Sequence, residues 1–304
     1  MTEDNVESRS GSDSHDELSP EAIEKLVQSV HPEKEYEFLP GFDRERLAKL
    51  YGLTLQEYEE FRSQFEENAH EAANELLTDR SFAHRVDRLP FQTGETIVGI
   101  GESVTADRQS WLVILDQLLM QRRGDDEIQI RNEGISGTTT TEALERMPSI
   151  LSQQPDWIIC FLGAADAVRH GVQARKTAVS TEETAMNLAE LRHLAEAQTS
   201  AQWVWITPPT INEELASNFP PFQMSQFTLL NEDLTAVGNS LRPRSSSDAE
   251  ENPVRESDPV IDIQSVFERP APSEFVQADG VHPSLVGHQA IAKAVVKQLT
   301  ERSD

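Results

Sequence analysis

The chain is poor in cysteine, in basic residues and in long apolar runs. Its one cysteine, Cys160, excludes a disulfide within the chain, and its place in the apolar run WIICFL predicts a buried, inert thiol. No apolar segment is long enough to span a membrane, and the N-terminal stretch MTEDNVESRSGSDSHDELSP has neither the basic nor the apolar region of a signal peptide. We therefore expect a cytoplasmic protein.

Positive charge is scarce throughout the sequence. Lys and Arg together number 26, and six of these are Lys, whereas Asp and Glu number 53, so the formal net charge is −27. Acidic residues spread over a whole chain are typical of a surface that stays hydrated in concentrated salt, where charge screening is strong. The composition favours a halophilic protein over a merely acidic mesophilic one. It also argues against nucleic acid or an anionic membrane as a partner.

The N-terminal third carries helical signals only. Residues 1–18 are acidic and rich in Ser, which predicts a disordered tail. Residues 19–89 predict a helical subdomain: Ser19 stands at an N-cap position before a Pro, and Thr54 with Glu57 forms a capping box ahead of an apolar stripe. Because this stripe is narrow, we expect the subdomain to pack against a partner surface, near the active-site edge of the rest of the chain.

From about residue 95 to 304, short apolar segments alternate with amphipathic ones. The predicted strands are 96–100, 128–132, 157–162, 203–208 and 259–263. The predicted helices are near 108–123, 140–152, 182–198, 222–239 and 285–301, with capping boxes at Thr139–Glu142 and Ser180–Glu183. This alternation indicates an α/β domain with a parallel sheet covered on both faces. The polar segment 242–258 predicts a flexible insertion.

Small and polar residues follow several of these strands. Ser103 comes after the first strand, Gly134 and Gly137 after the second, and Asp279 and His282 after the fifth. Ligands of open parallel sheets bind beyond the carboxyl ends of the strands, so these residues are expected at one edge. Taken singly, each has an ordinary explanation as a helix cap or a turn. Together, a hydroxyl, a carboxylate and an imidazole on one edge indicate nucleophilic catalysis.

Four blocks of the sequence resemble the SGNH (GDSL) hydrolase family, in the family's order and over residues 95–301. They are IVGIGESVTAD, RNEGISGTTTTEALERM, IICFLGAADAV and DGVHPSLVGHQAIAKAV. The first block has Glu102 where the family usually has Asp. The resemblance implies a flavodoxin-like three-layer α/β/α sandwich with a five-stranded parallel sheet, here preceded by the helical subdomain.

The resemblance also implies roles for individual residues. Ser103 matches the nucleophile, His282 the general base and Asp279 the acid that orients it. The backbone N–H groups of Ser103 and Gly137 match two donors of the oxyanion hole. The third donor of the family is an Asn side chain, and Ala165 stands at that position. Thr138, Arg169 and His170 are the nearest candidates to replace it, although a helix cap, a surface charge and a solvated loop residue are the simpler interpretations.

The prediction is therefore a serine esterase that acts on a small-molecule ester through an acyl-enzyme. Ala165 keeps open a degenerate, non-catalytic binding module of the same fold, and an acyltransferase would use the same residues. The remaining histidines lack metal-ligand spacing with acidic residues, so neither a metal nor a cofactor is expected. Trp203 and Trp205 are interpreted as packing residues. The acyl and leaving groups and the oligomeric state stay open.

Overall fold

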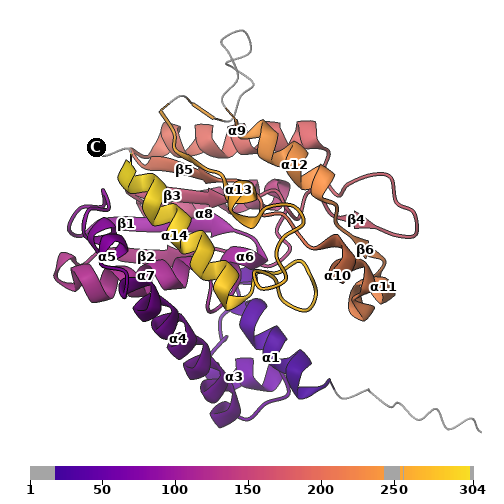
Figure 1. Cartoon of the computed structure of the whole chain (residues 1–304). Helices are drawn as coiled ribbons and strands as arrows, with labels where there is room; N and C mark the ends of the chain where they lie inside the picture. Colours follow the sequence, from indigo (N-terminus) through magenta and orange to yellow (C-terminus); the bar gives the residue numbers. More distant parts are fainter. Residues whose placement is uncertain (1–17, 243–253, 256, 302–304) are drawn as a thin grey trace, which may run out of the picture.

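A five-stranded parallel sheet organises the chain. The computed structural model describes residues 18–242, 254–255 and 257–301 (Figure 1). The sheet has the order β2-β1-β3-β5-β7, formed by Gln129–Asn132, Thr96–Gly101, Trp157–Phe161, Gln202–Ile206 and Val260–Ile261. All four pairings are parallel. This is the flavodoxin-like order, in which the chain changes direction across the sheet between β1 and β3 and leaves a crevice at their carboxyl ends. The predicted fold class is confirmed.

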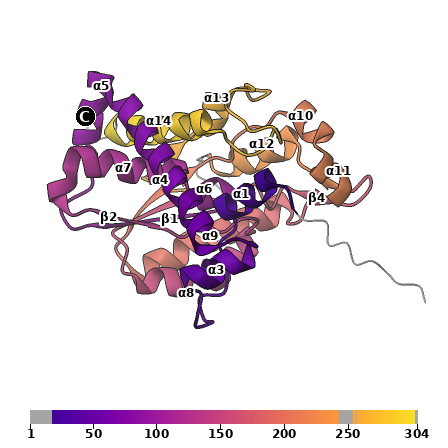
Figure 2. The same ribbon diagram turned by 90° about the horizontal axis from the view of Figure 1, so that it is seen from below.

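Side chains alternate across the sheet, and both faces are buried. In β1, Ile97 joins one apolar cluster, whereas Val98 and Ile100 join another on the opposite face. Figure 2 shows the two helical layers. The first face is covered by α7 (Trp111–Arg123) and α14 (Leu285–Glu301), and the second by α8 (Thr140–Ser152) and α9 (Thr181–Gln198). Burial on both faces explains why the strands read as continuous apolar runs.

The N-terminal helices extend one of these layers. They are α1 (Pro20–Ser29), α2 (Pro32–Glu35), α3 (Arg44–Leu50), α4 (Leu55–Leu77) and α5 (Arg80–Asp87). Both α4 and α5 pack against α7 and α14, and buried side chains such as Ala73 of α4 and Val86 of α5 belong to the main core. A smaller cluster joins α1, α3 and α4 through Val27, Tyr58 and Phe65. Tyr58 and Phe65 of the predicted stripe thus pack against α1 and α3, whereas the C-terminal half of α4 packs against α7 and α14.

Most predicted elements are found, and one helix is wrong. The predicted helices 140–152 and 285–301 match α8 and α14 in both bounds. Helix α10 (Glu213–Asn218) is absent from the prediction, and the single helix predicted at 222–239 is instead divided between α11 (Pro220–Ser225) and α12 (Asn231–Ser240). The two-residue strand β6 (Phe227–Thr228) lies between the last two and pairs with β4 (Arg169–His170). Pro220 starts α11 rather than continuing α10, because proline lacks the N–H that a helix interior needs.

Smaller differences concern caps and connections. The box at Thr139–Glu142 is complete, whereas Ser180 only accepts from the Glu183 N–H, without the return bond of a box. The helix predicted from residue 108 begins slightly later, at Trp111 in α7, and the short α6 (Ser103–Ala106) before it is absent from the prediction. The remaining elements are η1 (Gly124–Asp126) and α13 (Ile263–Phe267).

The two segments predicted to be disordered or flexible lie largely outside the described residues. The tail is described from Leu18 onward, and residues 243–253 and 256 of the insertion are not described. The end of the insertion differs from the prediction: Asp258 is buried and pairs with Arg192 at 3.0 Å. Within the described part of the chain, no helix is long and apolar enough to cross a membrane.

Candidate active site

Ser103 stands directly beyond the carboxyl end of β1. The strand ends at Gly101, Glu102 is extended, and Ser103 is the first residue of α6. Glycine is required at position 101 because a Cβ there would lie 2.3 Å from the Thr105 hydroxyl oxygen and 2.9 Å from the Phe161 carbonyl oxygen. Gly101 does not have a positive φ angle, so glycine is needed here for close packing and not for its backbone conformation. This packing fixes Ser103 at the crevice between β1 and β3.

Glu102 ties the first block of the sequence to the third. Its carboxylate is buried and accepts three backbone N–H bonds, from Gly163 at 2.6 Å, Ala164 at 2.8 Å and Ala165 at 2.9 Å. Burial and the nearby charge of Asp166 raise the pKa of Glu102 to about 8, although the three donors oppose this shift. The loop after β3 is therefore held in place by the residue next to Ser103. Sequence analysis registered Glu102 only as a departure from the family's Asp.

His282 and Asp279 form a hydrogen-bonded pair in the loop before α14. His282 Nδ1 lies 2.8 Å from Asp279 Oδ2, and Asp279 Oδ1 accepts the backbone N–H groups of Val281 and His282, each at 2.9 Å. Burial opposes ionisation of Asp279, but the bond from His282 and the charges of His282 and Lys25 lower its pKa to about 2. Because Nδ1 faces the carboxylate, Nε2 is the ring nitrogen left for other partners.

Gly137 lies in the loop between β2 and α8. Its φ of +76° is in the left-handed region, which favours glycine, and a Cβ at this position would meet no atom within 4 Å. The adjacent Ser136 donates its hydroxyl to the Ser29 carbonyl of α1. Within the described residues, the backbone N–H groups of Ser103 and Gly137 donate to no other group. Both residues line the same cavity.

This cavity has a volume of about 300 Å³ and brings the predicted residues together. Ser103, Gly137, Ala165 and His282 all line it, while Asp279 lies behind His282. The other wall is apolar and comes from the segments after β3 and β5 and from the loop before α14. Its members are Val168, Pro209, Ile211, Phe222, Phe227, Leu229, Leu234 and Val281.

The position of the missing Asn has no substitute among the residues named for it. The Ala165 side chain lines the cavity but carries no donor, and its N–H is already bonded to Glu102. Thr138, Arg169 and His170 do not line the cavity. Arg169 instead pairs with Asp233 at 2.8 Å, and the His170 ring packs edge-on against Phe227. Of the three oxyanion donors that the resemblance implies, the N–H groups of Ser103 and Gly137 stay available, as far as the chain is described.

Helix α1 supplies a wall of the cavity that sequence analysis did not identify residue by residue. Lys25, Leu26, Ser29 and Val30 line it. The helix is fixed to the loop after α6, because the Arg108 N–H donates to the Gln28 carbonyl at 3.0 Å and its Nε donates to the Val27 carbonyl at 2.9 Å. No local signal in the sequence marks these residues, since their position depends on how α1 docks.

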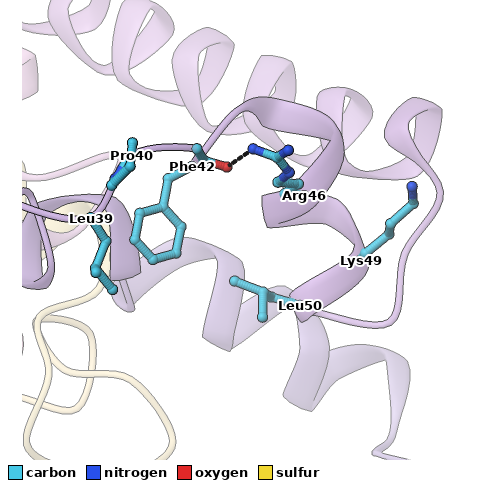
Figure 3. Close-up of a pocket in the computed structure, with 7 residues that line it drawn as sticks. Leu39, Pro40, Phe42, Arg46, Lys49 and Leu50 are labelled. Atoms are coloured by element: carbon cyan, nitrogen blue, oxygen red, sulfur yellow. Dashed lines mark hydrogen bonds between the residues drawn. The ribbon is translucent and has the colours of Figure 1, made fainter.

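Two other hollows lack such chemistry. One, of about 480 Å³, lies in the N-terminal helices and is lined by residues such as Leu39, Phe42 and Leu50, with Arg46 bonded to the Gly41 carbonyl (Figure 3). The other lies beside Trp203 and contains the Arg192–Asp258 ion pair. Neither is lined by a histidine. Among the described residues, no group of His, Cys, Asp and Glu is arranged to hold a metal ion.

A second histidine–aspartate pair is buried away from the cavity. His288 Nε2 lies 3.5 Å from Asp107 Oδ2, and His288 Nδ1 accepts from the Trp111 N–H at 3.3 Å. Both side chains are almost fully buried, and neither lines the cavity. The pair joins α14 to the start of α7 and gives His288 a structural role. Trp203 and Trp205 are likewise buried, with ring centroids 5.1 Å apart, as expected of packing residues.

The fold and the cavity define a hydrolase of the GDSL class, and comparison with known proteins agrees. Residues 98–290 match the model of the GDSL-like Lipase/Acylhydrolase family. The chain belongs to this family.

Curated relatives are hydrolases. The chain is 25% identical to "Thioesterase 1/protease 1/lysophospholipase L1" of Escherichia coli (strain K12) over 208 residues, which cover 67% of this chain and 83% of that protein. It is 34% identical to an arylesterase of Vibrio mimicus over 84 residues, or 26% of this chain and 41% of that protein.

Solved structures share the fold. LAE5, an α/β hydrolase enzyme from the metagenome of Lake Arreo, Spain, has a TM-score of 0.51 and 19% identity, covering 69% of this chain and 97% of its own. A GDSL-like lipase structure from Parabacteroides merdae has a TM-score of 0.50 and 20% identity, covering 70% and 99%. The family match begins at residue 98 and therefore leaves out the helices α1 to α5.

Proposed function

We propose that the chain hydrolyses carboxylic esters through an acyl-enzyme intermediate, with Ser103, His282 and Asp279 as its catalytic residues. The observation that carries this proposal is the cavity, which Ser103 and His282 line together while Asp279 holds the far nitrogen of the imidazole at 2.8 Å. In an acyl-transfer site these are the positions of nucleophile, base and orienting acid.

The reaction has two halves. His282 Nε2 takes the Ser103 hydroxyl proton as the serine oxygen attacks the ester carbonyl carbon. The resulting oxyanion accepts hydrogen bonds from the N–H groups of Ser103 and Gly137. When the tetrahedral intermediate collapses, the bond to the alcohol oxygen breaks and His282 returns the proton to it. His282 then takes a proton from water as the water oxygen attacks the acyl carbon. The bond between that carbon and the Ser103 oxygen breaks, His282 returns the proton to Ser103, and the carboxylic acid leaves.

The apolar wall of the cavity favours an acyl group that is itself apolar. Phe222, Phe227 and Leu229 present no charge to a substrate, and a pocket of about 300 Å³ admits a short or medium acyl group. The names of the relatives add aryl esters and thioesters as candidate substrates of this chain. Both chemistries would use the same nucleophile and donors.

The test is hydrolysis of p-nitrophenyl acetate in concentrated KCl, a medium chosen because the net charge is −27. Ser103→Ala should abolish both hydrolysis and labelling by a fluorophosphonate. The matched control is Ser152→Ala, which removes an exposed hydroxyl on α8 and should keep both. Hydrolysis and labelling that persist in Ser103→Ala would refute the assignment.

Ala165 supports a second candidate, a binding module that keeps the pocket without turnover. Such a module would bind an ester but leave Ser103 unlabelled in the folded protein. Transfer of the acyl group to an acceptor other than water is a third outcome, and competing alcohols distinguish it through the products formed.

A further inference from the structure

One cationic side chain from α1 reaches the cavity. Among the described residues that line it, Lys25 is the only lysine or arginine. Its Nζ donates a hydrogen bond to Gln277 Oε1, in the loop that carries Asp279 and His282. Gln277 is itself held there, because its backbone N–H donates to the His282 carbonyl at 2.8 Å and its Nε2 donates to the Pro283 carbonyl at 2.9 Å. The ammonium group therefore lies beside the loop of the catalytic histidine.

The Lys25 ammonium group has N–H donors that Gln277 does not occupy. A lysine carries three N–H donors, and Gln277 is a neutral acceptor that occupies one of them. Within the described residues, Lys25 forms no ion pair within 4 Å. Burial lowers the pKa of Lys25, while the carboxylates of Asp279 and Asp107 act against that shift. A half-buried ammonium without a paired anion is suited to an anionic ligand, since its charge is only partly screened by water.

A positive charge in the cavity wall stands out in a chain that is strongly negative overall. A net charge of −27 repels anionic substrates, and only six lysines occur in the sequence. Lys49, by contrast, is exposed and pairs with Glu45 at 2.8 Å. A cation placed in the cavity wall offsets the general repulsion at the position where a substrate would bind.

We propose that Lys25 determines specificity by binding an anionic group, a carboxylate or a phosphate, on the alcohol half of the ester. The proposal rests on the function proposed above. His282 returns its proton to the leaving oxygen, so the alcohol half lies on the side of the His282 loop, where Lys25 contacts Gln277. The acyl half then faces the apolar wall. A charge-assisted hydrogen bond of this kind should favour an anionic ester by about ten- to a hundredfold.

The test compares two esters that differ in one charge, 4-acetoxybenzoate and its neutral methyl ester. The ratio of their kcat/KM values is measured for the wild type, Lys25→Met, Lys25→Arg and the control Lys49→Met at one salt concentration. Because the electronic difference between the two leaving groups is the same in every variant, it cancels when ratios are compared. The ratio should fall about ten- to a hundredfold in Lys25→Met and stay near the wild-type value in Lys25→Arg and Lys49→Met.

Two results would overturn the proposal. A ratio in Lys25→Met within about threefold of wild type, a difference below 1 kcal/mol, means that no anion is recognised there. An equal loss on both esters means that Lys25 only positions the Gln277 loop. A third substrate, 4-acetoxyphenyl phosphate, separates the two anions: a larger effect than with the carboxylate identifies phosphate as the preferred group.

A binding measurement keeps this test independent of turnover. In the Ser103→Ala background, where neither ester should be consumed, calorimetry gives the affinity for each ester with Lys25 present and with Lys25→Met. Tighter binding of the anionic ester that disappears with Lys25→Met supports the proposal even if the wild type is inactive. If the two esters bind with equal affinity whether or not Lys25 is present, the proposal is overturned. Failure of the ester-hydrolase proposal alone does not affect this binding result.

Discussion

The Glu102 carboxylate accepts a hydrogen bond from the backbone N–H of Ala165, with 2.9 Å between Oε2 and the nitrogen. This bond holds the loop after β3 against Ser103, and it also occupies the one donor that Ala165 possesses. The scaffold that would carry a third oxyanion donor is therefore in place, while the donor itself is missing. Restoring it is the most direct test of how the site works.

Ala165→Asn should raise kcat on p-nitrophenyl acetate. The new amide would extend from a backbone position that already lines the cavity, and one oxyanion donor is worth about a hundred- to a thousandfold in turnover. The matched control is Ala165→Leu, which adds a side chain of similar size without an N–H. A gain with Asn alone supports the missing-donor explanation, and a similar loss with both would show that position 165 tolerates only a small residue.

Much of the fold follows from local patterns. The burial of β1, β3 and β5 on both faces follows from their continuous apolar runs, and α8 begins at its predicted capping box. The helix predicted at 222–239 is wrong because the chain leaves α11 at Gln226, which has a left-handed φ of +54°, and forms β6 before α12 begins. No glycine or proline marks this break between residues 222 and 231.

The site follows from the sequence only in part. Ser103 and His282 were expected at one edge, and they line one cavity, while their catalytic roles stay a prediction. Glu102 was visible as a residue, but its three bonds to the loop after β3 depend on tertiary contacts far along the chain. The same is true of Lys25, because the orientation of α1 depends on tertiary contacts with Asp107 and Arg108.

Asp279→Asn should lower kcat by about ten-thousandfold, because an amide cannot hold the imidazole in the tautomer that leaves Nε2 free. The fold should persist, since the Asn carbonyl can still accept the N–H groups of Val281 and His282. With a pKa of about 2, Asp279 stays ionised throughout the pH range of an ordinary assay. A kcat within tenfold of wild type, with an unchanged melting temperature, would contradict its role.

Glu102→Gln should change how stability depends on pH. The pKa of Glu102 in the folded chain, about 8, lies above the ordinary glutamate value of 4.5. Between these pH values the unfolded chain has released a proton that the folded chain retains. The contribution of Glu102 to the free energy of unfolding is fully present below about pH 4.5. It falls by a few kcal/mol as the pH rises through 8. Gln cannot ionise and should remove this slope.

The measurement is the free energy of unfolding in urea from pH 5 to 9 at constant KCl. At pH 5 the wild type should be the more stable, because Gln gives up one bond to the loop after β3, worth about 1 kcal/mol. The difference in the free energy of unfolding between the wild type and Glu102→Gln should narrow or reverse by pH 9. Glu60→Gln, an exposed site on α4, should run parallel to the wild type. Parallel curves for Glu102→Gln would mean that Glu102 is ionised in the folded state.

Glu33 predicts the opposite dependence at low pH. Burial opposes its ionisation, but contacts with His31 and Arg108, the latter at 3.2 Å, lower the pKa of Glu33 from 4.5 to about 2. The stability it contributes is present above about pH 4.5 and is lost as pH falls towards 2, by up to about 3 kcal/mol. Glu33→Gln should therefore be less stable at neutral pH and less sensitive to acid.

The control for Glu33 is Glu59→Gln, which breaks an ion pair with Arg44 at the surface. An exposed pair contributes about 1 kcal/mol or less, so this variant should keep the acid sensitivity of the wild type. Because Arg108 also holds α1 at the cavity, Glu33→Gln should weaken hydrolysis at neutral pH more than Glu59→Gln does. If Glu33→Gln and Glu59→Gln lose equal stability between pH 7 and 2.5, the Glu33–Arg108 ion pair does not help to hold α1 at the cavity.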